Sequence, residues 1–181
     1  MRDLRCVLRY LRGRPDLDPR RVALWGDSFA PPNPRGRNLA VPLDAARFPD
    51  QAEPLGGLLA LLGGLFEEDV RAVVVSGGLL GYRSLLDSPF LYVPHDALVP
   101  GVFSAGDVCD LAAALAPRGL WVEALVDGLN REVTAARTAR EFAPVRTVYR
   151  SLKAASQLRL EKKGETRRPA IRWLLSQFRM Q

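Results

Sequence analysis

Cysteine and histidine are almost absent from this sequence. The 181 residues include two cysteines, Cys6 and Cys109, and a single histidine, His95. A histidine-based metal site needs several imidazole groups, and the cysteines lie far apart in no metal-type spacing, so we expect no metal ion. Cys6 stands among apolar residues of a predicted helix, which indicates a buried thiol.

Long hydrophobic runs are also lacking. The most apolar stretch, residues 55–66, is too short to span a bilayer and contains four glycines. The charged N-terminus lacks the apolar segment of a secretion signal. Hydrophobic residues make up 48% of the chain and charged residues 25%, as in ordinary globular domains. We therefore expect one domain over residues 1–181, cytoplasmic by default.

The charge is unbalanced, with a formal net charge of +6 and a pI of about 9.9. Arginine supplies most of the positive charge, and it is spread along the whole chain. Nucleic-acid-binding proteins more often cluster basic residues within a recognisable module, and none is visible here. This pattern favours a solvated basic surface over nucleic-acid binding.

Helical periodicity alternates along the chain with short apolar runs typical of buried parallel strands. The patterns predict strands at 21–26, 70–76 and 120–126, and a short edge strand at 157–161. They predict helices at 2–12, 55–66, 108–115, 131–142 and 145–155, and one after Pro169. Such alternation indicates an α/β protein, a three-layer αβα sandwich with a mostly parallel sheet.

The first predicted strand ends in a motif that carries chemistry. Ser28 follows Gly26 by two residues and precedes Ala30 by two, which approximates the G-x-S-x-G turn of serine hydrolases. That turn exposes the hydroxyl, and the N–H of Phe29 would then serve as an oxyanion donor. The alternative is that Ser28 only caps a turn. A proline-rich insertion at about 31–54 also delays the helix that should follow at once.

The sequence around this motif resembles that of a known family. Residues 14–26, which end in Asp-Pro-Arg-Arg-Val-Ala-Leu-Trp-Gly, are similar to the segment before the nucleophile in α/β-hydrolases of the acetyl xylan esterase and dienelactone hydrolase type. Further similar segments lie at 70–78, 91–96, 99–101 and 115–118. The resemblance covers most of residues 2–181 and corresponds to the C-terminal half of that fold, truncated at the front. It implies cleavage of a small acyl ester, such as an acetylated sugar, without a cofactor.

The resemblance further implies an acid after a later strand and a histidine after the last one. Asp127 follows the predicted strand 120–126 and matches the acid, although it could equally cap a helix. Residues 162–165 stand where the histidine is expected and read Lys-Lys-Gly-Glu. His95 is the only substitute base, and its alternative is a structural histidine packed beside Pro94. Without an adjacent base a serine hydroxyl is a poor nucleophile.

The sequence therefore leaves two candidate functions. The first is a serine-dependent ester hydrolase, weak or inactive, with Ser28, Asp127 and His95 as catalytic residues and the Phe29 N–H as oxyanion donor. The second is a non-catalytic α/β-hydrolase-like interaction or structural domain that has lost the histidine. A sheet without its front half would expose an edge and apolar faces, which predicts a homo-oligomer or association with a missing N-terminal half. Nucleic-acid binding rests on charge alone.

Overall fold

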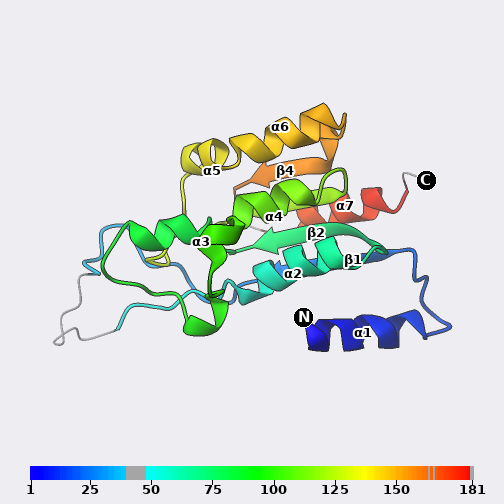
Figure 1. The fold of residues 1–181 in the computed structure, drawn as a ribbon, viewed down its shortest axis with the longest axis horizontal. Helices are drawn as coiled ribbons and strands as arrows, with labels where there is room; N and C mark the ends of the chain where they lie inside the picture. Colours follow the sequence, from blue (N-terminus) through cyan, green and yellow to red (C-terminus); the bar gives the residue numbers. More distant parts are fainter. Residues whose placement is uncertain (40–47, 163, 165, 180–181) are drawn as a thin grey trace.

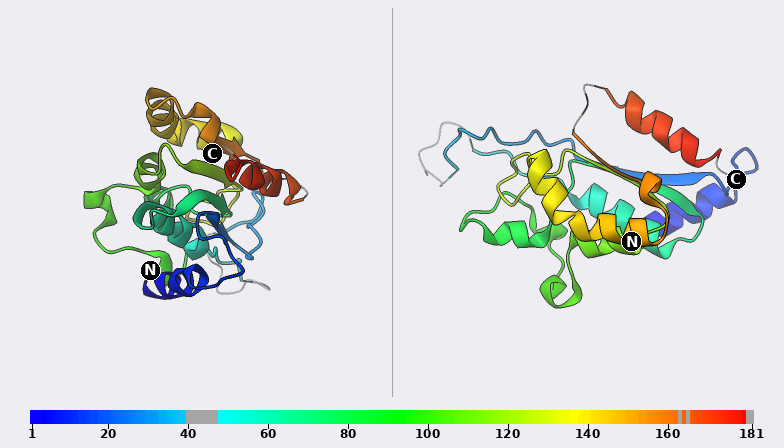
Figure 2. Two further views of the ribbon diagram at one scale, coloured as in Figure 1. Left: turned by 90° about the vertical axis from the view of Figure 1, so that its right-hand side faces the viewer. Right: turned by 90° about the horizontal axis from the view of Figure 1, so that it is seen from above.

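A parallel β-sheet forms the middle of three layers. The computed structural model describes residues 1–39, 48–162, 164 and 166–179. Four strands pair in chain order, and every pair is parallel: β1 (Val22–Asp27), β2 (Val70–Ser76), β3 (Gly119–Glu123) and β4 (Leu158–Glu161). Helices lie on both sides of this sheet (Figures 1 and 2). The predicted α/β class and three-layer architecture are confirmed.

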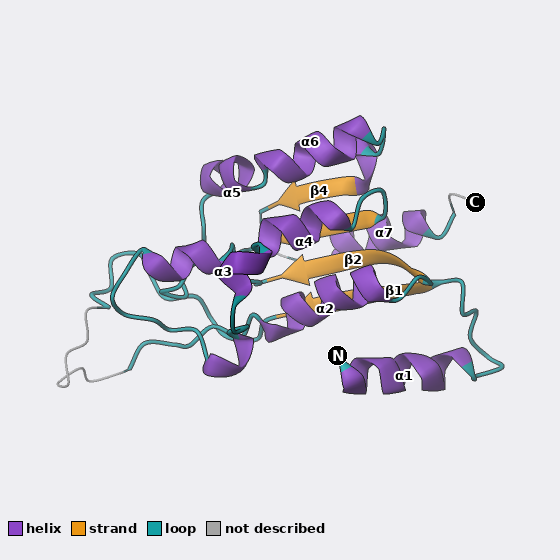
Figure 3. Cartoon of the chain, viewed as in Figure 1, coloured by secondary structure: helices purple, strands orange, loops and turns teal. Residues whose placement is uncertain are grey.

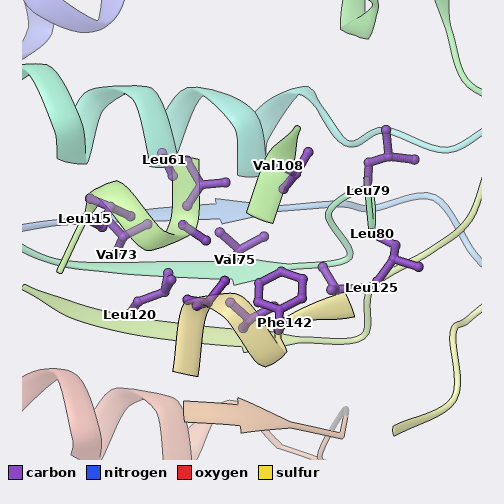
Figure 4. Packing of buried hydrophobic residues seen from close by; sticks show 14 of the residues in the cluster. Leu61, Val73, Val75, Leu79, Leu80, Val108, Leu115, Leu120, Leu125 and Phe142 are labelled. Atoms are coloured by element: carbon purple, nitrogen blue, oxygen red, sulfur yellow. The ribbon is translucent and has the colours of Figure 1, made fainter. Parts of the chain in front are cut away.

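One face of the sheet carries the main hydrophobic core. It lies beneath the helices that connect successive strands: α2 (Leu55–Phe66), α4 (Val108–Ala114), α5 (Ala135–Glu141) and α6 (Ala143–Ser151). Figure 4 shows Val73 and Val75 of β2 and Leu120 of β3 packed against side chains from α2 and α4. Right-handed connections between parallel neighbours place the linking helices on a common face, and this explains why the core gathers there.

The opposite face is covered by α7 (Arg168–Gln177) alone among the described helices (Figure 3). Ala170 and Trp173 of this helix pack on the sheet, and the Trp121 and Trp173 ring centroids are 5.6 Å apart. Pro169 occupies the first turn of α7, where its missing N–H costs no hydrogen bond. This smaller cluster leaves the β1 side of the face only partly covered.

Helix α1 (Arg2–Arg12) lies beside α2, where glycine makes room for it. A Cβ at Gly63 would lie 2.7 Å from a methyl carbon of Leu4 and 2.4 Å from one of Leu24. A Cβ at Gly26 would lie 2.1 Å from the carbonyl oxygen of Gly56, so the end of β1 meets the start of α2 backbone to backbone. The glycines of α2 are explained by this close packing on the strand and on α1.

Three predicted elements have clearly different limits in the structure. The helix predicted at 145–155 is α6, which ends at Ser151. β3 ends at Glu123 and not at residue 126, because Ala124 takes a positive φ of 53° and turns the chain out of the strand. α5 begins at Ala135 and not at residue 131, because Glu132 forms an antiparallel bridge with Val126. The segment 79–106 contains the short helices η1 (Tyr82–Leu86), η2 (His95–Ala97) and α3 (Val102–Ala105), and η3 (Ala155–Gln157) precedes β4.

The prediction that Cys6 is buried is wrong. The thiol is exposed, because Cys6 lies two positions from the buried Leu8, about 200° around the helix. In the described part of the chain, no single helix is long and apolar enough to cross a membrane. The segments 95–105 and 108–114 are long and apolar enough only when they are taken together, and the chain bends by 73° between them.

Candidate functional site

Ser28 directly follows β1, at the carboxyl end of the sheet as the sequence predicts. Its N–H donates to the carbonyl of Ser76 at 3.0 Å, so the parallel ladder continues through Ser28. Ser28 is not among the non-glycine residues with positive φ, and the next helix, α2, begins only at Leu55. The sharp strand-to-helix turn predicted after Gly26 is therefore not formed, because the proline-rich segment leads the chain away in extended conformation. Part of that segment, 40–47, lies outside the described residues.

The neighbours of Ser28 are unfavourable for an oxyanion. The Phe29 N–H, the predicted donor, points to the Glu53 carboxylate with an N–O distance of 3.4 Å. A carboxylate at the end of that N–H would repel the negative charge that an oxyanion hole must stabilise. The Phe29 ring is 82% exposed and shields nothing from water. The oxyanion role of Phe29 stays a prediction, and the contact with Glu53 weighs against it.

Asp127 stabilises a turn. Its Oδ1 accepts the N–H groups of Leu129 and Arg131, each at 3.0 Å, and its carbonyl accepts the N–H of Asn130 at 2.9 Å. Aspartate commonly closes turns in this way. It does not cap a helix either, because Thr134 is the N-cap of α5 and accepts the N–H of Arg137. The structure thus places Asp127 in a turn between β3 and α5, and its role as the catalytic acid stays a prediction.

His95 starts the short helix η2, and its side chain is exposed. Among the described residues its imidazole has no hydrogen-bond partner, and no hydrogen bond joins it to Ser28 or Asp127. The three predicted catalytic residues therefore form no connected triad in this structure. The segment 162–165, where the resemblance places a histidine, contains Lys163 and Glu165, which lie outside the described residues.

Two buried asparagines, which the sequence analysis did not single out, connect the segments at this end of the sheet. The Asn33 amide donates to the carbonyls of Asp50 and Leu129 at 2.8 and 3.0 Å, and its oxygen accepts the Asp50 N–H at 3.0 Å. The Asn130 amide donates to the carbonyls of Pro31 and Asp50, both at 3.0 Å. Their exposed fractions are 3% and 1%. These bonds fasten the chain after β1 to the turn after β3.

Tyr92 adds a further connection in the same region. Its hydroxyl donates to the carbonyl of Leu39 at 2.7 Å, its N–H donates to Gly128 at 2.8 Å, and its carbonyl accepts the Ala52 N–H at 2.7 Å. The chain itself thus occupies the space above the strand ends. Cavities of about 320 and 260 Å³ lie elsewhere, the first between α2 and the 99–111 segment and the second between α6 and β4.

A charged contact joins the end of β1 to the start of α7. Arg167 forms an ion pair with Asp27 at 2.5 Å, and its guanidinium carbon lies 5.9 Å from the Trp25 ring centroid. Both contacts favour a fixed position of α7 against β1. Within the described residues, no three His, Cys, Asp or Glu side chains come together as metal ligands.

Comparisons with models of protein families, with curated proteins and with solved structures find no match to this chain. A functional conclusion must therefore rest on the chain's own residues and their geometry.

Proposed function

We propose that this chain is a non-catalytic α/β domain of hydrolase-like type that associates with a second copy of itself through the outer edge of β1. The observation that carries the proposal is the open edge of β1 beside the part of the sheet that α7 leaves uncovered. The lack of a connected triad and the carboxylate at the Phe29 N–H weigh against ester hydrolysis as the function.

The free edge of β1 supports association through a strand. β1 pairs with β2 on one side, and no strand of the described residues pairs with the other. Such an edge presents unpaired N–H and C=O groups that favour pairing with another chain. Beside it, Ala23 and Trp25 are only half-buried, and α7 exposes Ile171 and Leu175 by 45% and 52%. Apolar surface beside an open strand edge is typical of an interface.

The sequence of β1 suits antiparallel pairing with itself. A two-fold axis through Leu24 would bring Ala23 of each chain opposite Trp25 of the second copy, a small side chain facing a large one. The same register would bring the exposed Arg21 opposite Asp27 of the second copy. Cross-strand pairs of opposite charge stabilise a sheet by up to about 1 kcal/mol, and a two-fold interface repeats each pair. The complementarity of size and charge favours a second copy as the partner.

Sedimentation velocity over a range of protein concentrations tests the proposal. The wild type should form a dimer, and Arg21→Asp should weaken it about tenfold or more, because two aspartates would face each other at both ends of the interface. The double variant Arg21→Asp/Asp27→Arg should restore the dimer. Ala23→Lys, which points a charge into the apolar surface, should abolish it.

Two controls make the result specific. Arg140→Asp changes the same charge on α5, away from β1, and should leave the dimer intact. The single variant Asp27→Arg measures how loss of the Asp27–Arg167 ion pair affects the dimer. Circular dichroism shows whether each variant is folded. A monomeric wild type, or a dimer unchanged by Ala23→Lys, would overturn the proposal.

A further inference from the structure

The other edge of the sheet carries a basic groove. A cavity of about 260 Å³ lies between helix α6 and the edge strand β4. Seen from above in Figure 2, β4 lies between α6 and α7. The residues that line the groove are Arg146, Tyr149 and Arg150 of α6, Ala155, and Leu158 and Leu160 of β4.

The charge of this groove is uncompensated. Arg146 and Arg150 are exposed, and neither side chain has an ion pair or hydrogen bond with a described residue. No acidic side chain lines the groove. The two arginines are four positions apart on α6, so both project from the same side of the helix. A guanidinium presents a planar set of donors that fits a carboxylate with two parallel hydrogen bonds.

The floor of the groove is a strand edge. β4 is the last strand of the sheet and pairs only with β3 among the described strands. Leu158 and Leu160 are half-buried and face the helices, where they pack against the main core. The outer edge of β4 therefore offers backbone hydrogen bonds beside an apolar floor and two cations. This combination is what an added peptide strand requires.

We propose that this groove binds an extended acidic peptide segment of a partner protein, which adds to β4 as a further strand and pairs two carboxylates with Arg146 and Arg150. Side chains four apart on a helix have Cβ atoms about 5–6 Å apart. Alternate residues of a strand project to one side about 6.6–6.8 Å apart. The two spacings differ by about 1 Å, which the long arginine side chains span, so the segment carries acidic residues at alternate positions. The site lies on the edge opposite β1 and is independent of the association proposed above.

Fluorescence anisotropy with labelled peptides tests this inference. A peptide with glutamates at alternate positions should bind the wild-type protein, and Arg146→Glu and Arg150→Glu should each weaken binding about tenfold or more. Arg172→Glu on α7 removes the same charge from the opposite face of the sheet and should change little. Arg146→Lys should retain part of the affinity, because it keeps the charge without the planar geometry. Circular dichroism shows that each variant is folded.

Two further peptides test the geometry. A peptide with the same composition but adjacent glutamates should bind more weakly. N-methylation at one set of alternate backbone nitrogens should abolish binding, whereas methylation at the other set should not, because only one set faces β4. Equal binding of both N-methylated peptides, or of adjacent and alternate glutamates, would overturn the proposal. So would Arg150-dependent binding of a single-stranded oligonucleotide without binding of the peptide.

Discussion

The two faces of the β-sheet differ in how completely they are covered. On one face, α2, α4 and α6 bury the side chains of β2 and β3, and Val73 and Leu120 are 0% exposed. On the other face, α7 covers β2 and β3 but leaves Trp25 and Ala23 of β1 half-buried. The covered face stabilises the fold of the single chain. The partly covered face retains apolar surface, which the proposed second copy would bury.

The largest expected effect tests whether the covered face dominates stability. Leu120→Ala should lower the free energy of unfolding by about 3 kcal/mol, because it leaves a cavity in the main core. Leu174→Ala on α7, which removes the same atoms from a half-buried side chain, should cost about 1 kcal/mol. Urea denaturation at one protein concentration measures both. Equal losses would contradict the contrast between the faces.

A smaller effect is expected at Glu67, where α1 is fastened to the outside of the covered face. The guanidinium groups of Arg12 and Arg5, each 2.8 Å away, hold the pKa of the Glu67 carboxyl below its usual range. A lowered folded-state pKa gives stability that is present above the unfolded value of about 4.3 and is lost as the pH falls through the folded value. Glu67→Gln should therefore cost roughly 1 kcal/mol at neutral pH, allowing for the solvent exposure of both arginines.

The pH dependence separates this ion pair from general packing. In urea denaturation from pH 7 to pH 3, the difference between wild type and Glu67→Gln should shrink as the pH falls. Glu68→Gln is the matched control, because the carboxylate of Glu68, next to Glu67 in the chain, is exposed and has no ion pair with a described residue. A difference that stays constant with pH would show that the ion pairs of Glu67 add no stability, and would leave the Arg12–Asp69 pair as the charged contact of α1.

The smallest effect is expected at Ser28, where the chain leaves the sheet after β1. Hydrolysis of p-nitrophenyl acetate should be the same for wild type, Ser28→Ala and His95→Ala, because no base among the described residues is hydrogen-bonded to the hydroxyl and Glu53 faces the Phe29 N–H. An active wild type with an inactive Ser28→Ala variant would restore the esterase interpretation. Loss of activity in His95→Ala as well would identify the base.

Much of the fold could be predicted because it depends on local patterns. The limits of α1 and α2 agree with the prediction. Apolar runs located β1 and β2 because a buried parallel strand needs apolar residues on both faces. The end of β3 was missed because the positive φ of Ala124 follows from contacts made by Leu125 and Val126 with distant residues, which no local pattern records.

The candidate site was less predictable. The motif around Ser28 correctly indicated a position at a strand end, but the path of the chain beyond it depends on Asn33 and Asn130. Asn130 lies 102 positions after Ser28 and 97 after Asn33, in no recognisable motif, and only the fold brings the partners of the two asparagines together. The turn at Asp127 depends on which N–H groups the carboxylate accepts, those of Leu129 and Arg131, and the residue type alone does not specify this.

The sequence by itself determined the class of this protein: alternating helical and strand patterns with glycines at close contacts define a parallel sheet between helices. Tertiary structure decided what stands at the strand ends, because the partners of Phe29 and of the buried asparagines come from segments far apart in the chain. It also decided which surfaces remain open, since the coverage of an edge or a face depends on how whole elements pack and not on the residues of any one element.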